Sequence, residues 1–374
     1  MVAAERLRSV MAEALVLAER ARMRVEPNPA VGAIVLDSGG AVVGRGHTAA
    51  YGGLHAEPAA LREAGVAARG GTLVTTLEPC AHTRKKTPPC VRAIAAAGIA
   101  HVVAGVADPN PATAGQARAA LAASGIGYHE GVCESEAAAA IADYAAHLRT
   151  DVPWTIAKWA LSADGRTADA RGASRWITGA PARALVHEIR ARVEAVVVGV
   201  ATVIADDPQL TARDAEASGL PPATRVVLDS ALRVPPSARL VVSARAAPTI
   251  VICAAGAPGS RRAVLEDAGV VVIETDADAD GRVDVLAGFR ALRARGVRRA
   301  LLEAGGTLTG AALRSGVVHQ VMAFVAPLVI GGTSAPGPFA GDGWLIGAAP
   351  RLVHSRVSAV GDDALLEGYW PTGR

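Results

Sequence analysis

A histidine, a glutamate and two cysteines constrain the N-terminal half of this chain more than any other feature. His55 and Glu57 lie two residues apart, and Cys80, which follows Pro79, and Cys90 come later. One His and two Cys are ligand types of a catalytic zinc ion that keeps its fourth position open for water. Glu57 is not needed as a ligand. These residues therefore predict a zinc site in which Glu57 moves protons.

The spacing of the motif indicates which class of zinc enzyme it belongs to. His-x-Glu followed by Pro-Cys-x-x-Cys is typical of zinc deaminases that act on nucleobases. Here the longer run from Ala81 to Pro89 separates the cysteines. Zinc lowers the pKa of bound water to about 7, so that Glu57 can take its proton and pass it to a leaving amine. The alternative is a closed structural site with His47 or His82 as the fourth ligand, which would leave Glu57 without a purpose.

Composition excludes several other classes of protein. The 374 residues are enough for two domains, and a hydrophobic content of 51% supports a substantial core. A net charge of +3 and an aromatic content of 3% do not indicate a nucleic-acid partner. Without a signal pattern or a long apolar run, we expect no membrane association and a cytoplasmic protein. Four cysteines are too few for a disulfide framework, and Cys133 and Cys253 are predicted to be buried apolar fillers.

Alternating strand and helix patterns predict two α/β domains, with the boundary at residues 151–153. In the first, we expect helices at 5–22, 55–64, 90–97, 113–124 and 134–149, and strands at 31–36, 41–44, 72–77 and 100–106. In the second, we expect strands at 154–161, 195–200, 225–228, 249–253, 270–274, 299–303, 320–326 and 364–369, and helices at 180–192, 261–268, 284–295 and 308–315. The first strand of the second domain is not followed by Gly-x-Gly-x-x-Gly, which argues against a standard Rossmann site.

Three further local patterns indicate ligand binding. Asn28 stands between two prolines that fix the backbone, so its amide suits a pyrimidine edge, although a plain turn fits equally well. The pair Gly305-Gly306 lies between a strand that ends at Glu303 and a helix, a context that suits a cofactor pyrophosphate. The chain has only three lysines, of which Lys158 falls within an apolar strand where an unpaired charge is costly.

Together these motifs resemble a known enzyme family, the bifunctional deaminase/reductases of riboflavin biosynthesis, over nearly the whole chain. The first half carries the segments 27–32, 44–47, 55–57, 76–82, 87–90 and 108–111 of this pattern. The second half carries the segments 158–166, 174–179, 187–190, 206–213 and 303–306. The resemblance is specific because several motifs occur in the same order in both halves.

The resemblance implies a cytidine-deaminase-like three-layer α/β/α domain at 1–148 and a dihydrofolate-reductase-like α/β domain at 153–374. It implies Zn²⁺ and NADPH as cofactors. It also implies a small-molecule substrate, a diaminopyrimidinone carrying a ribosylamino 5′-phosphate, which is first deaminated and then reduced from ribosyl to ribityl. We expect a homo-oligomer, a dimer or a tetramer. The alternatives are a family member with an impaired deaminase that acts mainly as the reductase, or a deaminase/reductase of a related pteridine or pyrimidine pathway.

The resemblance also implies roles for individual residues. Those that contact the deaminase substrate would be Asn28, His47, His82, Lys85 and Lys86. Those that contact NADPH would be Ala160, Trp176, Thr202, Asp206, Gly305, Gly306 and Thr307. Those that contact the reductase substrate would be Lys158, Ser174, Thr178, Arg190, Leu210, Arg213 and Glu303, with the two arginines on its phosphate because their forked donors stay charged.

Two departures from the family pattern mark this chain. Arg84-Lys85-Lys86 replaces the usual Gly-basic pair between the cysteines and adds one residue, which alters the path open to the loop. The run Thr113-Ala114-Gly115-Gln116-Ala117 follows Asp108-Pro109-Asn110-Pro111 where the family usually has Val and a second Gly. Zinc ligation should survive both changes. Two rivals, a deaminase of tRNA or nucleosides with an unrelated second domain and a zinc-stabilised binding module without catalysis, lack support from the remaining motifs.

Overall fold

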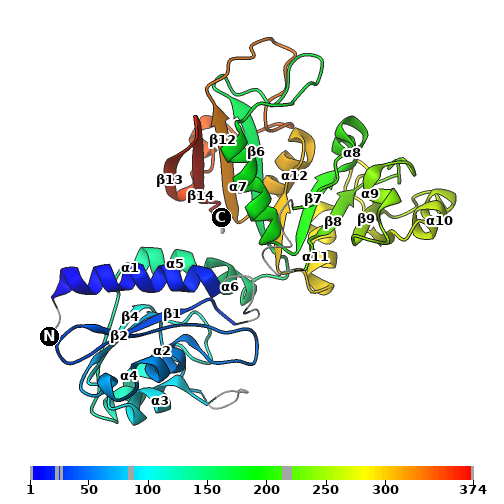
Figure 1. The fold of residues 1–374 in the computed structure, drawn as a ribbon. Coiled ribbons are helices and arrows are strands. Elements are labelled where there is room, and N and C mark those ends of the chain that lie inside the picture. Colours follow the sequence, from blue (N-terminus) through cyan, green and yellow to red (C-terminus); the bar gives the residue numbers. More distant parts are fainter. Residues whose placement is uncertain (1–2, 22–24, 26–27, 83–87, 213–220, 372–374) are drawn as a thin grey trace. The chain divides into compact units, whose positions relative to one another are not determined.

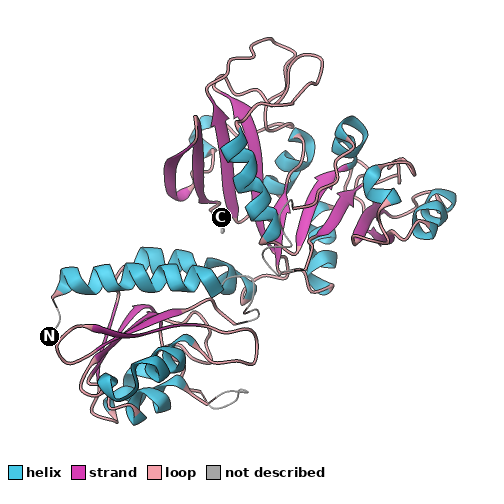
Figure 2. Ribbon diagram, viewed as in Figure 1, coloured by secondary structure: helices cyan, strands magenta, loops and turns pink. Residues whose placement is uncertain are grey.

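The structure is a computed structural model that describes residues 3–21, 25, 28–82, 88–212 and 221–371. The chain divides into two compact units, residues 1–149 and 150–374. Each consists of a β-sheet with helices (Figures 1 and 2). Within the described residues, every helix is too short or too polar to cross a lipid bilayer.

The first unit is built on a five-stranded sheet in the order β2-β1-β3-β4-β5. The strands are β1 (Gly32–Leu36), β2 (Val42–His47), β3 (Thr72–Leu77), β4 (His101–Val106) and β5 (Gly127–Glu130). Strand β1 pairs antiparallel with β2 and β3, whereas β3, β4 and β5 run parallel. The carboxyl end of β3 therefore lies beside that of β4, and Cys80 follows β3 at this edge.

Helices cover both faces of this sheet. Helices α1 (Ala4–Ala21) and α5 (Glu134–Ala140) lie on one face, and α2 (Ala56–Ala64), α3 (Cys90–Ala96) and α4 (Gln116–Ala122) lie on the other (Figure 1). Alternate residues of β1 serve the two cores: Ile34 packs with α1, and Val35 packs under α2 and α3. The unit is therefore a three-layer α/β/α sandwich, as expected.

Helix α2 lies unusually close to the sheet. A Cβ added to Gly46 in β2 would lie 2.2 Å from the carbonyl oxygen of Ala56. Only glycine allows this approach, so the start of α2, with His55 as its N-cap, is held directly against β2.

The second unit contains a nine-stranded sheet in the order β10-β9-β8-β7-β11-β6-β12-β14-β13. The strands are β6 (Trp154–Ser162), β7 (Ala195–Gly199), β8 (Thr224–Leu228), β9 (Thr249–Ala254), β10 (Val271–Thr275), β11 (Arg299–Leu302), β12 (Gln320–Ala326), β13 (Val353–Val360) and β14 (Asp363–Tyr369). The strands from β10 to β12 are parallel, and β14 and β13 complete the sheet in antiparallel pairing.

Helices connect the parallel strands of this sheet. They are α7 (Ala180–Ala191), α8 (Val200–Asp206), α9 (Arg239–Val242), α10 (Gly259–Asp267), α11 (Val285–Ala294) and α12 (Gly306–Arg314). Phe289 and Leu292 of α11 and Leu313 of α12 pack with strand residues in one apolar core. Helices α8 and α12 begin close after the neighbouring strands β7 and β11, so their N-termini lie at the same edge of the sheet.

Several expectations about the fold were wrong. The single helix expected at 134–149 is two helices, α5 and α6 (Ala142–His147), because Ile141 leaves helical geometry to enter the core, where it is 3% exposed. Strands β5 and β13 and helices α8 and α9 were not expected. Cys253 is buried as predicted, but Cys133 is only partly buried and has a φ of 54°.

Candidate active sites

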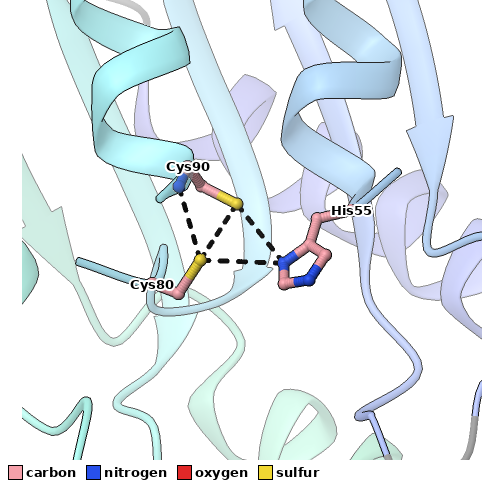
Figure 3. A group of neighbouring side chains, drawn as sticks. All are labelled: His55, Cys80 and Cys90. Atoms are coloured by element: carbon pink, nitrogen blue, oxygen red, sulfur yellow. Dashed lines mark hydrogen bonds between the residues drawn. The ribbon is translucent and has the colours of Figure 1, made fainter. Parts of the chain in front are cut away.

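Three ligand atoms meet at the carboxyl edge of the first sheet. The Cys80 and Cys90 sulfurs are 3.2 Å apart, and Nδ1 of His55 lies 3.7 Å from the first and 3.4 Å from the second (Figure 3). A tetrahedral zinc ion with bonds of about 2.0–2.3 Å needs ligand atoms about 3.3–3.8 Å apart. A disulfide would need about 2.05 Å. Both nitrogen–sulfur distances fall in this range and the sulfur–sulfur distance is slightly shorter, so the three atoms are placed to share one metal ion. No other such cluster of metal-ligating side chains occurs among the described residues.

Three different elements supply these ligands. His55 is the N-cap of α2, Cys80 follows β3 after Pro79, and Cys90 is the first residue of α3. The backbone N–H of Cys90 donates to the Cys80 sulfur over 3.4 Å, and this donor favours the thiolate that zinc needs. Cys90 lies at a helix start, whereas Cys80 is in the loop after β3.

Cys80→Ser is expected to remove most of the zinc. A hydroxyl is a poor substitute for a thiolate, and the remaining His55 and Cys90 leave only two ligands. Metal analysis of the purified variant measures the effect, with Cys253→Ser as the matched control because Cys253 is a buried cysteine of the other unit. Full zinc occupancy in Cys80→Ser would contradict the ligand assignment.

Glu57 lies beside the ligands without joining them. It is in the first turn of α2, is 4% exposed, and its Oε2 accepts a hydrogen bond from the Cys90 thiol over 3.3 Å. Burial, with the charge of Cys80 in support and His55 in opposition, raises the pKa of Glu57 to about 6. A carboxyl group with a pKa near neutrality can both accept and donate a proton.

No role was predicted for Glu78 from the sequence. Its side chain connects the loop after β3, which carries Cys80, to the segment between β4 and α4. It is 3% exposed. Its Oε2 accepts the backbone N–H of Asp108 over 3.1 Å and of Gly115 over 3.0 Å, and its Oε1 accepts that of Ala117 over 3.0 Å. In the sequence, Glu78 is marked only by its place at the end of an apolar strand. Its three backbone donors lie more than 25 residues away, so these hydrogen bonds could not be predicted from that place.

The other residues expected to contact the deaminase substrate differ in burial and in their hydrogen bonds. Asn28 is partly buried before β1, and its backbone N–H donates to the carbonyl of Val25 over 2.9 Å. His47 is exposed at the end of β2 and lines an open cavity of about 560 Å³. His82 is partly buried, with Nδ1 3.0 Å from the Thr113 hydroxyl. Lys85 and Lys86 lie outside the described residues.

A group of two cations and one carboxylate occupies the carboxyl edge of the second sheet. Glu303 follows β11, and its two oxygens accept Nε of Arg190 over 2.5 Å and Nη2 over 2.9 Å. Lys158, on the neighbouring strand β6, has its ammonium 3.8 Å from Glu303 Oε2. The side chains are 11% exposed for Glu303 and 17% for both cations. The Glu303 carboxylate thus occupies part of the N–H donors of the Arg190 guanidinium.

This arrangement shifts the pKa values of its members. Burial would raise the pKa of Glu303, but the charges of Lys158 and Arg190 outweigh it and hold that pKa below its usual value. Burial lowers the pKa of Lys158, and Glu303 opposes this only in part. A lysine with a lowered pKa next to an ionised carboxylate can exchange a proton more readily than a free lysine.

The residues expected at NADPH come from several elements, among them the N-terminus of α12 and helix α8. Gly305 is the N-cap of α12, and a Cβ there would meet open space, whereas one at Gly306 would press on the backbone of 337–340. The remaining positions of this set are Thr307 in the first turn of α12, Thr202 and Asp206 in α8, and Ala160 in β6. Two helix N-termini at one edge of a parallel sheet suit an anionic cofactor.

Trp176 lies in the loop before α7 and is 64% exposed. The guanidinium of Arg183 lies 4.6 Å from its ring centre and donates to the carbonyl of Thr178. Ser174, in the same loop, is partly buried. Leu210 is buried with a φ of 55°, an uncommon conformation for a leucine. Arg213 lies outside the described residues.

Comparison with known proteins gives full-length matches. The chain matches the family models of the cytidine and deoxycytidylate deaminase zinc-binding region over residues 4–106 and of the RibD C-terminal domain over residues 153–366. The riboflavin biosynthesis protein RibD of Escherichia coli (strain K12) is 37% identical over 367 residues, which cover 95% of this chain and 97% of the relative. That of Mycobacterium tuberculosis (strain ATCC 25618 / H37Rv) is 38% identical over 341 residues, which cover 91% and 90%.

Solved structures agree with these matches. RibD of Acinetobacter baumannii, form 1, superposes with a TM-score of 0.80 at 33% identity, covering 99% of this chain and 100% of that one. A diaminohydroxyphosphoribosylaminopyrimidine deaminase/5-amino-6-(5-phosphoribosylamino)uracil reductase of Thermotoga maritima superposes with a TM-score of 0.80 at 30% identity, covering 98% and 99%. The chain therefore belongs to the RibD family and is a bifunctional enzyme of riboflavin biosynthesis, with a zinc-dependent deaminase and an NADPH-dependent reductase.

Proposed function

We propose that residues 1–148 hydrolyse an amine from 2,5-diamino-6-ribosylamino-4(3H)-pyrimidinone 5′-phosphate. Residues 153–374 then reduce the product, 5-amino-6-(5-phosphoribosylamino)uracil, at its ribosyl group to give the ribityl side chain. The observation that carries this proposal is the pairing of a three-ligand zinc cluster beside Glu57 with a Lys158–Glu303–Arg190 group on a separate sheet. The Thermotoga maritima relative is named for the same two activities.

In the deaminase, zinc supplies the Lewis acidity that makes water a nucleophile at neutral pH. His55, Cys80 and Cys90 are its proposed ligands. Glu57 takes a proton from the water and delivers it to the departing amine, for which its burial and raised pKa are suitable. Asn28, His47 and His82, together with Lys85 and Lys86, are proposed to hold the substrate.

In the reductase, NADPH supplies the hydride, and the protein must bring the nicotinamide against the ribosyl C1. Gly305, Gly306 and Thr307 at the N-terminus of α12 are proposed to hold the cofactor, with Thr202 and Asp206 of α8, Ala160 and Trp176 as further contacts. Lys158 and Glu303 are proposed to contact the sugar, with Ser174, Thr178 and Leu210 around it. Arg213 and the N–H groups of Arg190 that Glu303 does not engage are proposed to bind the phosphate.

A coupled assay tests the whole proposal. The enzyme is supplied with the diaminopyrimidinone phosphate and NADPH, and ammonia release and NADPH oxidation are followed separately. Both signals are expected, with ammonia appearing first. Absence of both signals with the first substrate, together with normal NADPH oxidation when the deaminated compound is supplied, would favour an impaired deaminase.

Residues 153–374 expressed alone are expected to reduce the deaminated substrate with NADPH and to need no zinc. The motivation is that the zinc ligands belong to the first compact unit and the Lys158–Glu303–Arg190 group to the second. Reductase activity is measured with and without a chelator, and the full chain with Cys80→Ser provides the control for any loss of folding. Zinc-dependent reduction in the full chain would contradict this separation.

We further propose a cytoplasmic homo-oligomer, a dimer or a tetramer. Strand β13 is an edge strand whose residues are nearly all exposed, and Leu345 and Ile346 are 84% and 99% exposed. Exposed edges and apolar patches are surfaces that proteins usually cover. Sedimentation analysis is expected to give a mass of at least two chains, and Ile346→Glu to lower it. A monomeric wild-type protein at micromolar concentration would contradict this.

A further inference from the structure

A long segment without helix or strand follows β12 and is held along its length by other parts of the second unit. Residues 327–341 belong to it, and long loops of this kind inside a compact domain usually serve a function. The turn after β6 contacts one end of this segment, and helix α12 contacts the other (Figure 1). The 327–341 segment therefore connects that turn to the helix at whose N-terminus the cofactor is proposed to bind.

Asp164, in the turn after β6, holds the first end of the segment. Its Oδ1 accepts the backbone N–H of Ile330 over 3.0 Å, and its Oδ2 accepts that of Gly331 over 2.7 Å. The hydroxyl of Ser162, a fully buried residue at the end of β6, donates to Oδ1 over 2.6 Å. These donors lower the pKa of Asp164 to about 2, so the carboxylate is an ionised acceptor at physiological pH.

The same turn also holds the middle of the segment. Nη1 of Arg166 donates to the carbonyl of Ala335 over 2.8 Å. The backbone N–H of Thr167 donates to the carbonyl of Pro336 over 2.9 Å. These two contacts bind carbonyl groups of the segment, whereas Asp164 is the member of the turn that binds its N–H groups.

The other end of the segment is packed against α12. The backbone N–H of Ala340 donates to the carbonyl of Gly306 over 3.0 Å. A Cβ added to Gly310, one turn further along α12, would lie 2.4 Å from the carbonyl oxygen of Ala340. Phe339 and Trp159 meet edge to face beside this contact, with ring centres 4.8 Å apart. The absence of a side chain at Gly310 therefore lets the segment lie directly on the helix.

The two glycines at the start of α12 have different neighbours. A Cβ at Gly305 would meet open space, and its φ of −68° is one that any residue adopts. A Cβ at Gly306 would lie 3.2 Å from the nitrogen of Ala340 and 3.3 Å from two further backbone atoms of the segment. Gly305 is therefore the glycine that leaves room for a pyrophosphate, and Gly306 is the one that the segment requires.

We propose that Asp164 is a positioning residue of the reductase, which acts through the 327–341 segment to hold the first turn of α12 in place for the pyrophosphate of NADPH. This inference rests on the proposed function, in which that turn binds the cofactor. The backbone N–H groups of a helix N-terminus bind a pyrophosphate only if they point at it, and small misplacements of a binding group are costly. Asp164 would act on cofactor affinity without contacting the reacting atoms.

Asp164→Asn tests the first contact at nearly constant size. The amide offers one acceptor oxygen in place of two and places an NH₂ donor against an N–H of the segment. In the zinc-loaded full-length protein, the dissociation constant of NADPH, measured by the fluorescence of the bound cofactor, should rise about 10-fold. The KM of the deaminated substrate at saturating NADPH, the kcat of reduction and the rate of ammonia release should each stay within about twofold.

Asp169→Asn is the matched control. Asp169 lies in the same loop, and its Oδ1 accepts two backbone N–H groups of that loop, from Arg171 over 2.8 Å and from Ala173 over 2.9 Å. The same chemical change therefore breaks a comparable turn that does not bind Ile330 or Gly331. This variant should bind NADPH as tightly as the wild type.

Gly310→Ala disturbs the segment from its other end. The added methyl group must displace the carbonyl of Ala340, whereas alanine favours the helix more than glycine does. A rise in the NADPH dissociation constant of about 10-fold would therefore not be due to a weaker helix. Because both changes act on one path, the double variant with Asp164→Asn should weaken NADPH binding by less than the product of the two single effects.

Amide hydrogen exchange gives a readout that needs no cofactor. In Asp164→Asn without NADPH, exchange should become faster in the 327–341 segment and in the first turn of α12, and should be unchanged in the first unit. Unchanged exchange in the first turn of α12 would overturn the inference. Equal losses of affinity for NADPH and for the deaminated substrate would also overturn it, because they would indicate a general structural role.

The remaining outcomes separate this inference from the proposed function. Wild-type NADPH affinity in Asp164→Asn would overturn the inference even if reduction is normal. If that variant were insoluble, wild-type affinity in Gly310→Ala would overturn it instead. A wild-type enzyme that releases ammonia but binds no NADPH would contradict the proposed function of the second unit, a result that none of the variants can produce.

Discussion

Glu57→Gln is expected to lower the rate of ammonia release by about 10²–10⁴-fold, the usual cost of removing a positioned acid/base. Glutamine keeps the shape of the buried side chain but cannot take up a proton. Because Glu57 is not one of the three ligands, zinc content should stay at the wild-type level. NADPH-dependent reduction of the deaminated substrate should also be unchanged, since it belongs to the other unit.

Glu136→Gln is the matched control for this variant. Glu136 also lies in the first turn of a helix of the same unit, α5, but it is exposed. It should retain full deaminase activity, so that a loss in Glu57→Gln cannot be attributed to a changed helix terminus. Ammonia release at the wild-type rate by Glu57→Gln would remove Glu57 from the mechanism.

Lys158→Met is expected to lower the rate of reduction by at least about 100-fold while leaving the protein as stable as the wild type, or more stable. The ammonium lies 3.8 Å from Glu303 and its pKa is lowered by burial, so the folded state gains little from holding it charged. Glu303 keeps its two hydrogen bonds to Arg190 in the variant. Urea unfolding and the NADPH assay measure the two effects independently.

Glu303→Gln should have the opposite effect on stability. It leaves Lys158 and Arg190 without a counter-charge in a largely buried place, a change that typically costs about 3–5 kcal/mol. Arg262→Gln, which breaks two ion pairs between well-exposed side chains, is the control and should cost at most about 1 kcal/mol. The opposite result, a lower stability for Lys158→Met and an unchanged stability for Glu303→Gln, would contradict the view that Glu303 stabilises the folded state and Lys158 does not.

The zinc cluster could be predicted from the sequence because zinc binds particular residue types. His55, Cys80 and Cys90 are soft or borderline ligands, and the strand before Cys80 and the helix after Cys90 are strongly patterned, so their convergence at a sheet edge follows from the α/β layer rule. Lys158 and Glu303 come together through strand register: β11 pairs parallel with β6 with Leu302 opposite Ala157, so that Glu303, just after β11, lies beside Lys158 in the middle of β6.

Other features depend on packing that leaves no local pattern. Strand β13 has residues that are nearly all exposed, so it carries no signal of a half-buried strand. Helix α5 ends before Ile141 without a glycine or proline, because the core takes up that side chain. The bidentate pairing of Arg190 with Glu303 joins residues 113 positions apart, and from the sequence alone Arg190 was expected only on the phosphate.

The buried carboxylate of Glu78 has a consequence for how the deaminase meets its substrate. Three amide protons, those of Asp108, Gly115 and Ala117, are held by one ionisable side chain that water barely reaches. These amides can exchange with solvent only when the whole loop opens, so they should be among the slowest-exchanging loop amides of the unit. A loop that is already ordered before the substrate binds loses little conformational entropy on binding. The affinity of the deaminase should therefore depend on contacts rather than on loop closure.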